Sequence, residues 1–164
     1  MPKSHLSLDA LHERVVITYG TFDMFHVGHL NLLKRLKALG GKLIVAVSTD
    51  EFNKLKGKST LIPFEQRKAI VEAIREVDLV IPEESWEQKV GDIQKYKVTT
   101  FAIGNDWEGK FDDLSEYCEV KYLERTSGIS TTELKDALRK FTAIPKEDIL
   151  RAFEIFELLK KDFE

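Results

Sequence analysis

Two histidines, His26 and His29, stand three positions apart in the stretch YGTFDMFHVGH, directly after an apolar run. If a helix begins at the second histidine, both imidazoles and several unpaired backbone N–H groups come together at a helix N-terminus. The helix dipole and these free donors favour a phosphate there. Gly20, Thr21 and Gly28 are small enough to let an anion approach the backbone. The stretch therefore predicts a phosphate-binding turn.

Two other interpretations compete for the same residues. A pair of histidines three apart is, on its own, more often a pair of core or capping side chains. The side chains of Asp23, His26 and His29 could also be the ligands of a zinc ion. That spacing does not match H-E-x-x-H, and no glutamate stands between the histidines to act as a base. The order of strand, turn and helix favours the phosphate, so we expect no protein-held metal.

A second group of small and polar residues, RTSGISTT, occupies positions 125–132. Ser130 and Glu133 have the spacing of a capping box, which predicts a helix over Thr131–Phe141 with Gly128 in the loop before it. The hydroxyl groups and free N–H groups at such a helix start also suit an anion. The chain thus offers two helix starts for one anionic ligand.

The elements that must position these residues alternate between strands and helices. This order is typical of an α/β fold with a parallel sheet and helices on both faces. Ligands of such sheets gather at the carboxyl ends of the strands. We expect five strands, at Arg14–Tyr19, Leu43–Ser48, Leu79–Ile81, Phe101–Ile103 and Glu119–Leu123.

Helical spacing of apolar residues predicts the connecting helices. The first is expected over His29–Leu39 and the second from Pro63, with Ile70, Ile74 and Val77 on its inner side. A third is expected over residues 85–97, where Ser85 and Gln88 have capping-box spacing. A last helix follows Pro145, with an apolar stripe at Ile149, Ala152, Phe153, Phe156, Leu159 and Phe163. We expect this stripe to pack on the core or on a second subunit.

These expectations give one Rossmann-like domain over residues 15–141, an N-terminal extension over 1–14 and a C-terminal helix over 142–164. At 164 residues the chain has room for one well-buried core. Its formal net charge of -3 disfavours a surface that tracks a nucleic acid. The sequence has neither a secretory signal pattern nor an apolar run long enough to span a membrane, and its lone cysteine, Cys118, predicts a reduced packing residue. We therefore expect a cytoplasmic protein.

The sequence resembles a known family in its motifs. HVGH matches the HxGH signature of the nucleotidyltransferase superfamily, and RTSGISTT is similar to the cytidylyltransferase signature RTxGISTT. The segments YGTFD, STDEFN, WEQK and DWEGKF resemble the glycerol-3-phosphate cytidylyltransferases in particular. The likeness extends over about Val15 to Lys140 and leaves the two ends unmatched.

The resemblance implies a reaction, substrates and an assembly. CTP and sn-glycerol 3-phosphate would give CDP-glycerol and pyrophosphate, and CDP-glycerol would be a precursor for teichoic-acid or capsule polymers. The enzyme would be a homodimer. Mg²⁺ would arrive mainly on the triphosphate oxygens. An acceptor phosphate is already anionic near neutral pH, so catalysis needs positioning and neutralisation of charge rather than a protein base.

The resemblance also implies roles for individual residues. The catalytic set would be His26, His29, Lys58 and Arg125. Residues that bind CTP would be Thr21, Phe22, His26, Gly28, His29, Lys58, Asp106, Arg125, Thr126, Gly128, Ile129, Ser130, Thr131 and Thr132. Lys56 and Lys89 would bind the acceptor.

The roles of several neighbouring residues stay open. Asp106 would contact the cytosine amino group or the ribose, whereas Trp107 is as well explained by packing. Asp23 would fix a nearby histidine or Lys58. Arg67 and Arg75 fit the surface of an amphipathic helix.

Two alternatives to this function remain open at the level of sequence. HxGH and RTSGISTT do not distinguish glycerol 3-phosphate from phosphoethanolamine, phosphocholine or another polyol phosphate. A choline-type acceptor calls for an aromatic or acidic pocket, whereas lysines suit an uncharged polyol that carries phosphate. The alternative from another class is a catalytically silent nucleotide-sensing or interaction module.

Overall fold

The computed structural model describes residues 13–161, and its centre is a five-stranded parallel sheet. The strands occur in the order β3-β2-β1-β4-β5, and every pairing between neighbours is parallel. Their bounds are β1 Val15–Gly20, β2 Lys42–Ser48, β3 Leu79–Glu83, β4 Thr100–Gly104 and β5 Glu119–Leu123. The strand order reverses between β1 and β4, which is the point where ligands of such sheets bind. The predicted Rossmann-like α/β fold is confirmed.

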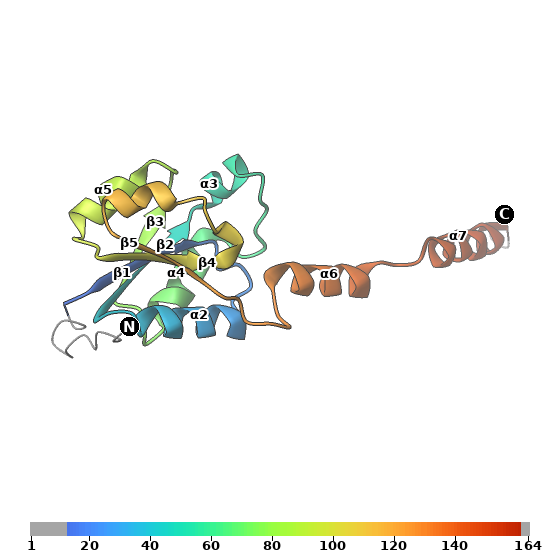
Figure 1. Ribbon diagram of the computed structural model, residues 1–164. Coiled ribbons are helices and arrows are strands. Elements are labelled where there is room, and N and C mark those ends of the chain that lie inside the picture. Colours follow the sequence, from blue (N-terminus) through green and yellow to red (C-terminus); the bar gives the residue numbers. More distant parts are fainter. Residues whose placement is uncertain (1–12, 162–164) are drawn as a thin grey trace. The chain divides into compact units, whose positions relative to one another are not determined.

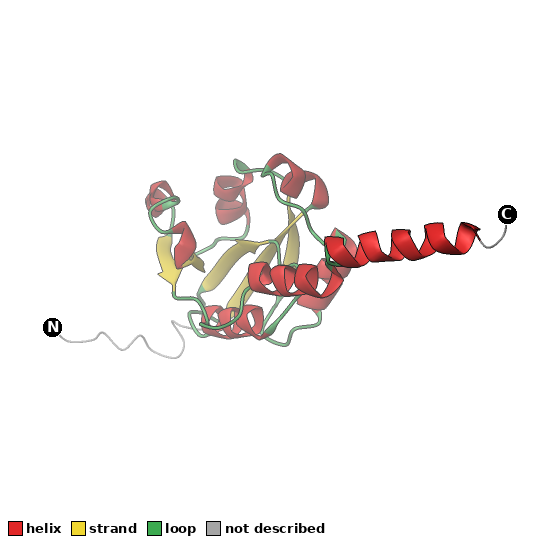
Figure 2. Ribbon diagram, turned by 90° about the vertical axis from the view of Figure 1, so that its right-hand side faces the viewer, coloured by secondary structure: helices red, strands yellow, loops and turns green. Residues whose placement is uncertain are grey.

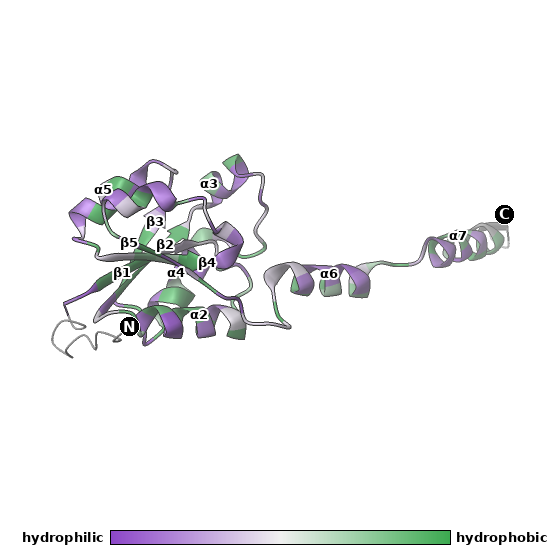
Figure 3. Ribbon diagram, in the orientation of Figure 1, coloured by the Kyte–Doolittle hydropathy of each residue, from purple (hydrophilic) through white to green (hydrophobic). Residues whose placement is uncertain are grey.

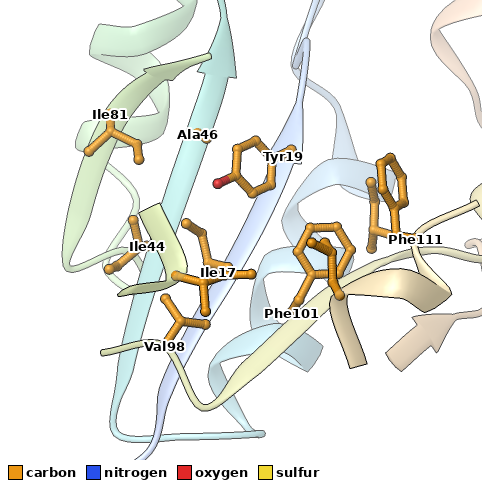
Figure 4. Close-up of a cluster of buried hydrophobic side chains, with 11 residues drawn as sticks. Ile17, Tyr19, Ile44, Ala46, Ile81, Val98, Phe101 and Phe111 are labelled. Atoms are coloured by element: carbon orange, nitrogen blue, oxygen red, sulfur yellow. The ribbon is translucent and has the colours of Figure 1, made fainter. Parts of the chain in front are cut away.

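Alternate residues of the strands enter two separate cores, one on each face of the sheet. Val16 of β1 packs on one face, while its neighbours Ile17 and Tyr19 pack on the other with Phe101 and Phe111. Figure 4 shows the second of these clusters, where the side chains of β1, β2 and β4 meet. The near-continuous apolar runs of the sequence arise because both faces are covered.

Helices cover both faces, as predicted (Figure 1; Figure 2). Helices α2 (Val27–Lys37) and α4 (Phe64–Glu72) supply Leu33, Leu36 and Val71 to one core. Helix α5 (Gln88–Lys95) supplies Ile93 to the other. The short helix α3 (Asp50–Leu55) follows β2, and the 3₁₀ turns η1 (Asn105–Trp107) and η2 (Asp112–Glu116) lie between β4 and β5.

Four details of the predicted helices are wrong. Helix α2 begins at Val27 rather than at the second histidine, because His26 is its N-cap. Helix α3 was not predicted, although Thr49 caps it and two acidic residues open it. Helix α5 begins at Gln88, three residues later than expected, although the Gln88 side chain accepts the backbone N–H of Ser85, as the predicted capping-box spacing expects.

The fourth error concerns the inner side of α4. The helix ends at Glu72, so Ile74 and Val77 follow it, and Ile70 is exposed. Its buried residues are Arg67 and Val71. The predicted surface position of Arg67 is wrong as well, whereas Arg75 is exposed as expected.

The chain divides into two compact units, Met1–Thr131 and Thr132–Glu164. The second unit contains most of α6 (Thr131–Thr142) and all of α7 (Lys146–Lys161). Both helices carry apolar and polar residues side by side (Figure 3). The predicted C-terminal helix is therefore present. Phe163 of its stripe and residues 1–12 of the N-terminal extension lie outside the described residues, and the domain limits at 14/15 and 141/142 stay predictions.

Two smaller expectations concern single features of the chain. Cys118 is partly buried and packs against the core that contains Phe101, as expected of a packing residue. Within residues 13–161, no helix combines the length and apolar character that crossing a membrane requires.

Candidate active site

The histidine turn, residues 20–29, joins the carboxyl end of β1 to α2 and holds both histidines by their own backbone. His26 Nδ1 accepts the N–H of Gly28 at 3.0 Å, and His29 Nδ1 accepts the N–H of His26 at 3.3 Å. The two rings thus form a reciprocal capping box. Since each Nδ1 acts as an acceptor, the proton of a neutral ring must reside on Nε2. Both histidines therefore offer an Nε2–H donor to a ligand.

The surroundings keep these rings neutral. Their centroids lie 3.9 Å apart in a stacked arrangement, and Phe22 and Phe25 flank His29. Burial, with smaller contributions from His26 and Arg125, lowers the pKa of His29 to about 4. Burial and Arg125 also lower the pKa of His26. At neutral pH the turn thus presents two preorganised, uncharged donors, which suit an oxygen on which charge develops.

Gly28 is required by the packing of this turn. A Cβ on Gly28 would lie 2.8 Å from His26 Cε1 and 3.3 Å from Ile129 Cγ2. Only a residue without a side chain therefore leaves the His26 ring in its capping position, and the approach of an anion to Gly28 stays a prediction. Phe22, buried in the same turn, adopts a positive φ of 53°.

Thr131, the last residue of the first compact unit, contacts the histidine turn. Thr131 Oγ1 donates to the Asp23 carbonyl at 3.1 Å and lies 3.4 Å from His26 Nε2. Gly128, in the turn before Thr131, has a φ of 77°, a backbone conformation that glycine adopts without strain. A hydroxyl and an imidazole donor thus converge on one place.

Other residues of the second motif occupy more peripheral positions. Arg125 is exposed and forms a 3.5 Å ion pair with Asp106. Thr126 Oγ1 accepts a hydrogen bond from Arg35 at 3.0 Å, so its hydroxyl already has a protein partner. Ser130 is partly buried and Thr132 is exposed.

An ion pair between the buried Arg67 and the partly exposed Asp50 supports the histidine turn, and it was not predicted. Arg67 is 1% exposed, donates to the Thr21 carbonyl at 2.6 Å and pairs with Asp50 at 2.8 Å. The carboxylate of Asp23 accepts the backbone N–H groups of Leu61 and Ile62. These bonds attach the loop before α4 to the histidine turn. Thr21 also donates to Asn53 Oδ1 at 3.1 Å.

The lysine cluster, formed by Ser48, Lys56, Glu83 and Lys89, lies at the carboxyl ends of β2 and β3. Glu83 Oε1 accepts from Lys89 Nζ at 2.9 Å, and Oε2 accepts from Lys56 Nζ at 3.2 Å and from Ser48 Oγ. The side chains of Lys56, Glu83 and Lys89 are only 7%, 3% and 4% exposed. Lys56 and Lys89 thus meet at one carboxylate, which was not predicted, and their role toward the acceptor stays a prediction.

Aromatic rings enclose the two ammonium groups. Lys56 Nζ lies 4.3 Å from the Phe52 ring centroid, and Lys89 Nζ lies 4.3 Å from the Tyr19 centroid. Trp86 lies 5.5 Å and 4.9 Å from the two nitrogens. Cation–π attraction is strongest in such partly desolvated surroundings. The cluster is therefore a cation cage that the protein's own lysines fill.

The lysine cluster adjoins the histidine turn. Ser48 Oγ, which accepts a hydrogen bond from Lys56 Nζ at 2.8 Å, lies 3.4 Å from the carbonyl oxygen of Gly20. Lys58 follows two residues after Lys56 and is exposed, with its Nζ 5.2 Å from the Trp107 centroid. Trp107 also packs against Trp86 and Phe111, as the packing interpretation expects. Neutral donors and paired charges thus lie at one edge of the sheet.

A resident metal has no evident ligands in the described part of the chain. Over residues 13–161, no three His, Cys, Asp or Glu side chains gather closely enough to hold an ion. Both oxygens of Asp23 accept backbone N–H groups, and the Nδ1 atoms of both histidines are engaged as caps.

Comparisons with known proteins show the family of the chain. The family model described as cytidylyltransferase-like matches residues 17–137, and the chain belongs to this family. It is 62% identical over 120 residues to glycerol-3-phosphate cytidylyltransferase of Bacillus spizizenii, which covers 73% of this chain and 93% of that protein. The enzyme of the same name from Staphylococcus aureus is 56% identical over 123 residues, or 75% and 93% of the two chains.

A solved structure shares the fold at lower identity. The lipopolysaccharide core biosynthesis protein of Thermoplasma volcanium superposes with a TM-score of 0.61 at 23% identity, over 70% of this chain and 98% of that one. The family match ends at residue 137, so α7 lies beyond the shared region.

Proposed function

We propose that the protein transfers CMP from CTP to sn-glycerol 3-phosphate and releases pyrophosphate. An oxygen of the acceptor phosphate attacks the α-phosphorus in line, a new P–O bond forms, and the bond from the α-phosphorus to the bridging oxygen of the β-phosphate breaks. The electron pair leaves with pyrophosphate, and no proton has to be removed from the acceptor. The juxtaposition of the histidine turn and the lysine cluster supports this proposal most strongly, together with the names of the relatives.

The histidine turn suits the triphosphate. Neutral Nε2–H donors of His26 and His29 would stabilise the charge that moves from the α-phosphate to the leaving group. Arg125 and Lys58 are exposed cations at its margin and would neutralise the same charge. We assign Thr21, Phe22, Gly28, Asp106, Thr126, Gly128, Ile129, Ser130 and Thr132 to the wall of the CTP site.

The lysine cluster favours an acceptor without a positive charge. Phosphocholine and phosphoethanolamine carry cations that seek aromatic rings and carboxylates. Here Tyr19, Phe52, Trp86 and Glu83 already hold ammonium groups of the protein. A phosphate dianion with a neutral polyol is the acceptor that such a cluster would attract.

The metal ion, the location and the assembly complete the proposal. Mg²⁺ would enter bound to the triphosphate oxygens of CTP, because the described residues offer no acidic cluster of their own. We place the protein in the cytoplasm, where CTP is available, and we propose a homodimer.

An assay of pyrophosphate release tests the proposal. The donors are CTP, ATP, GTP and UTP, each combined with glycerol 3-phosphate, phosphocholine and phosphoethanolamine. We expect turnover with CTP and glycerol 3-phosphate only. Equal turnover with ATP would make the protein an adenylyltransferase, preference for a cationic acceptor would refute the acceptor, and no turnover with any pair would favour the silent sensing module.

A further inference from the structure

Glu83 is a buried carboxylate that the proposed reaction does not use directly. It ends β3, opposite Ser48 in the parallel register of β2 and β3. Its two oxygens accept from different lysines, Oε1 from Lys89 at 2.9 Å and Oε2 from Lys56 at 3.2 Å. One side chain therefore sets the separation of the two ammonium groups.

Without this carboxylate the two ammonium groups would be difficult to keep together. Both are almost fully buried, and burial disfavours the charged form of a lysine. Burial lowers the pKa of Lys56, and Lys58 and Lys89 lower it further, whereas Glu83 raises it. Glu83 thus opposes both desolvation and the mutual repulsion of the cations.

The other groups around the cluster do not replace Glu83. Tyr19 donates its hydroxyl to Asp92 at 2.8 Å, so the Asp92 carboxylate faces that hydroxyl. Burial, Asp92 and Glu83 raise the pKa of Tyr19, so the phenol stays neutral. Lys58 adds a positive charge beside Lys56. Among the groups that these contacts identify, Glu83 is the carboxylate that hydrogen-bonds to both lysines.

The hydrogen bonds also leave donors for a ligand. An ammonium group has three N–H donors. Lys56 uses two of them, toward Glu83 and Ser48, and Lys89 uses one toward Glu83. At least one N–H of each lysine therefore stays outside the hydrogen bonds of the cluster, and these are the donors that a phosphate would use.

We propose that Glu83 is the positioning residue of the acceptor site, which holds the ammonium groups of Lys56 and Lys89 at a fixed separation for the acceptor phosphate. This inference rests on the proposed function, because it takes the lysine cluster as the place where glycerol 3-phosphate binds. Glu83 itself does not touch the reacting atoms. Its removal should therefore affect affinity for one substrate and its pH dependence, and leave the use of CTP largely intact.

The experiment compares wild type with Glu83→Gln, which has the same shape without the charge. Glu84→Gln is the matched control, because Glu84 is exposed and the change in charge is the same one residue along the chain. We expect KM for glycerol 3-phosphate to rise about tenfold or more in Glu83→Gln, the scale of one lost charge-assisted hydrogen bond, and KM for CTP to change less than about threefold. The control should match wild type.

The pH profile separates positioning from a structural role. In Glu83→Gln the Lys56 ammonium loses its counter-charge and should deprotonate at lower pH. KM for glycerol 3-phosphate should then begin to rise at a lower pH than in wild type and recover as the pH falls. Wild type and Glu84→Gln should show a flatter profile. A flat profile in Glu83→Gln, or equal changes in KM for both substrates, would overturn the proposal.

Two further measurements keep the test decisive. If Glu83→Gln does not fold, Glu83→Asp takes its place, because aspartate retains the charge but cannot reach both lysines. This variant should raise KM for glycerol 3-phosphate and keep the wild-type pH profile. An unchanged KM would contradict the proposal. NMR titration of the Lys56 side chain does not depend on the acceptor. If wild type does not use glycerol 3-phosphate, the proposed function fails, and identical Lys56 titration in wild type and Glu83→Gln would refute the positioning role too.

Discussion

The histidine turn and the lysine cluster lie at adjoining strand ends, yet they prepare for anions in opposite ways. In the turn, backbone N–H groups occupy one nitrogen of each ring, and burial lowers the pKa values of both histidines. In the cluster, a buried carboxylate and aromatic rings hold two ammonium groups. One region offers neutral dipoles and the other offers permanent charges.

This difference indicates a division of work between the two substrates. Preorganised donors act where charge moves during the reaction, so their loss lowers kcat. Fixed charges attract a substrate that is a dianion before it reacts, so their loss raises KM. The predictions below test this division, beginning with the largest expected effect.

Replacement of His26 or His29 by Ala should lower kcat by about 10²- to 10³-fold, the scale of one preorganised donor to a developing oxyanion. Val27→Ala is the control, because Val27 lies between them and its side chain is exposed. Steady-state kinetics with CTP and glycerol 3-phosphate, with circular dichroism to verify folding, provide the measurement. A folded histidine variant with wild-type kcat would remove that residue from the phosphate site.

Lysine variants should show the opposite kinetic signature. Lys56→Ala or Lys89→Ala should raise KM for glycerol 3-phosphate about ten- to hundredfold, as expected for a lost charge-assisted hydrogen bond, with a smaller rise for CTP. Lys58→Ala should mainly raise KM for CTP. If all three variants affect both substrates alike, the lysines supply only a general positive field.

The low pKa of His29 predicts a specific loss of stability in acid. The folded state resists protonation until about pH 4, whereas the unfolded state binds a proton near pH 6.5. Between these values the unfolded chain holds more protons, so the free energy of unfolding decreases as the pH falls, by roughly 2 kcal/mol from this group. Urea unfolding at pH 7 and pH 4 should show a smaller decrease for His29→Asn than for wild type; equal decreases would contradict the burial of a neutral ring.

Deletion of residues 142–164 should have the smallest effect on chemistry. The family match ends at residue 137, and no residue of α7 is assigned to the site. We expect kcat within about threefold of wild type, with any change confined to stability or oligomeric state, measured by size exclusion and thermal unfolding. A stable, correctly assembled truncation without activity would place the last helix in the active site.

The sheet could be predicted from the sequence because each strand is a short apolar run followed by polar residues. All five predicted strands are present, within two residues of the expected ends. Helix starts were harder, since a capping bond sets each boundary. His26 caps α2 through its ring, and histidine is not among the usual capping residues.

The site could be predicted in part. Motif residues such as His26, Gly28 and Thr131 meet because they follow strands or open helices at one sheet edge. Glu83 and Arg67 were missed because a charged residue in a polar segment has no sequence signal for burial. One signal was available for Glu83, because it is the last residue of an otherwise mostly apolar strand, at the same edge of the sheet as the motif residues after β1.

The division of work is tested most directly by NMR titration of wild-type protein labelled with ¹⁵N-histidine and ¹³C-lysine, with each substrate added alone. CTP should shift the resonances of His26 and His29 and leave those of Lys56 and Lys89 nearly unchanged. Glycerol 3-phosphate should do the reverse. If each substrate shifts both sets of resonances equally, the two regions do not serve separate substrates and the account is contradicted.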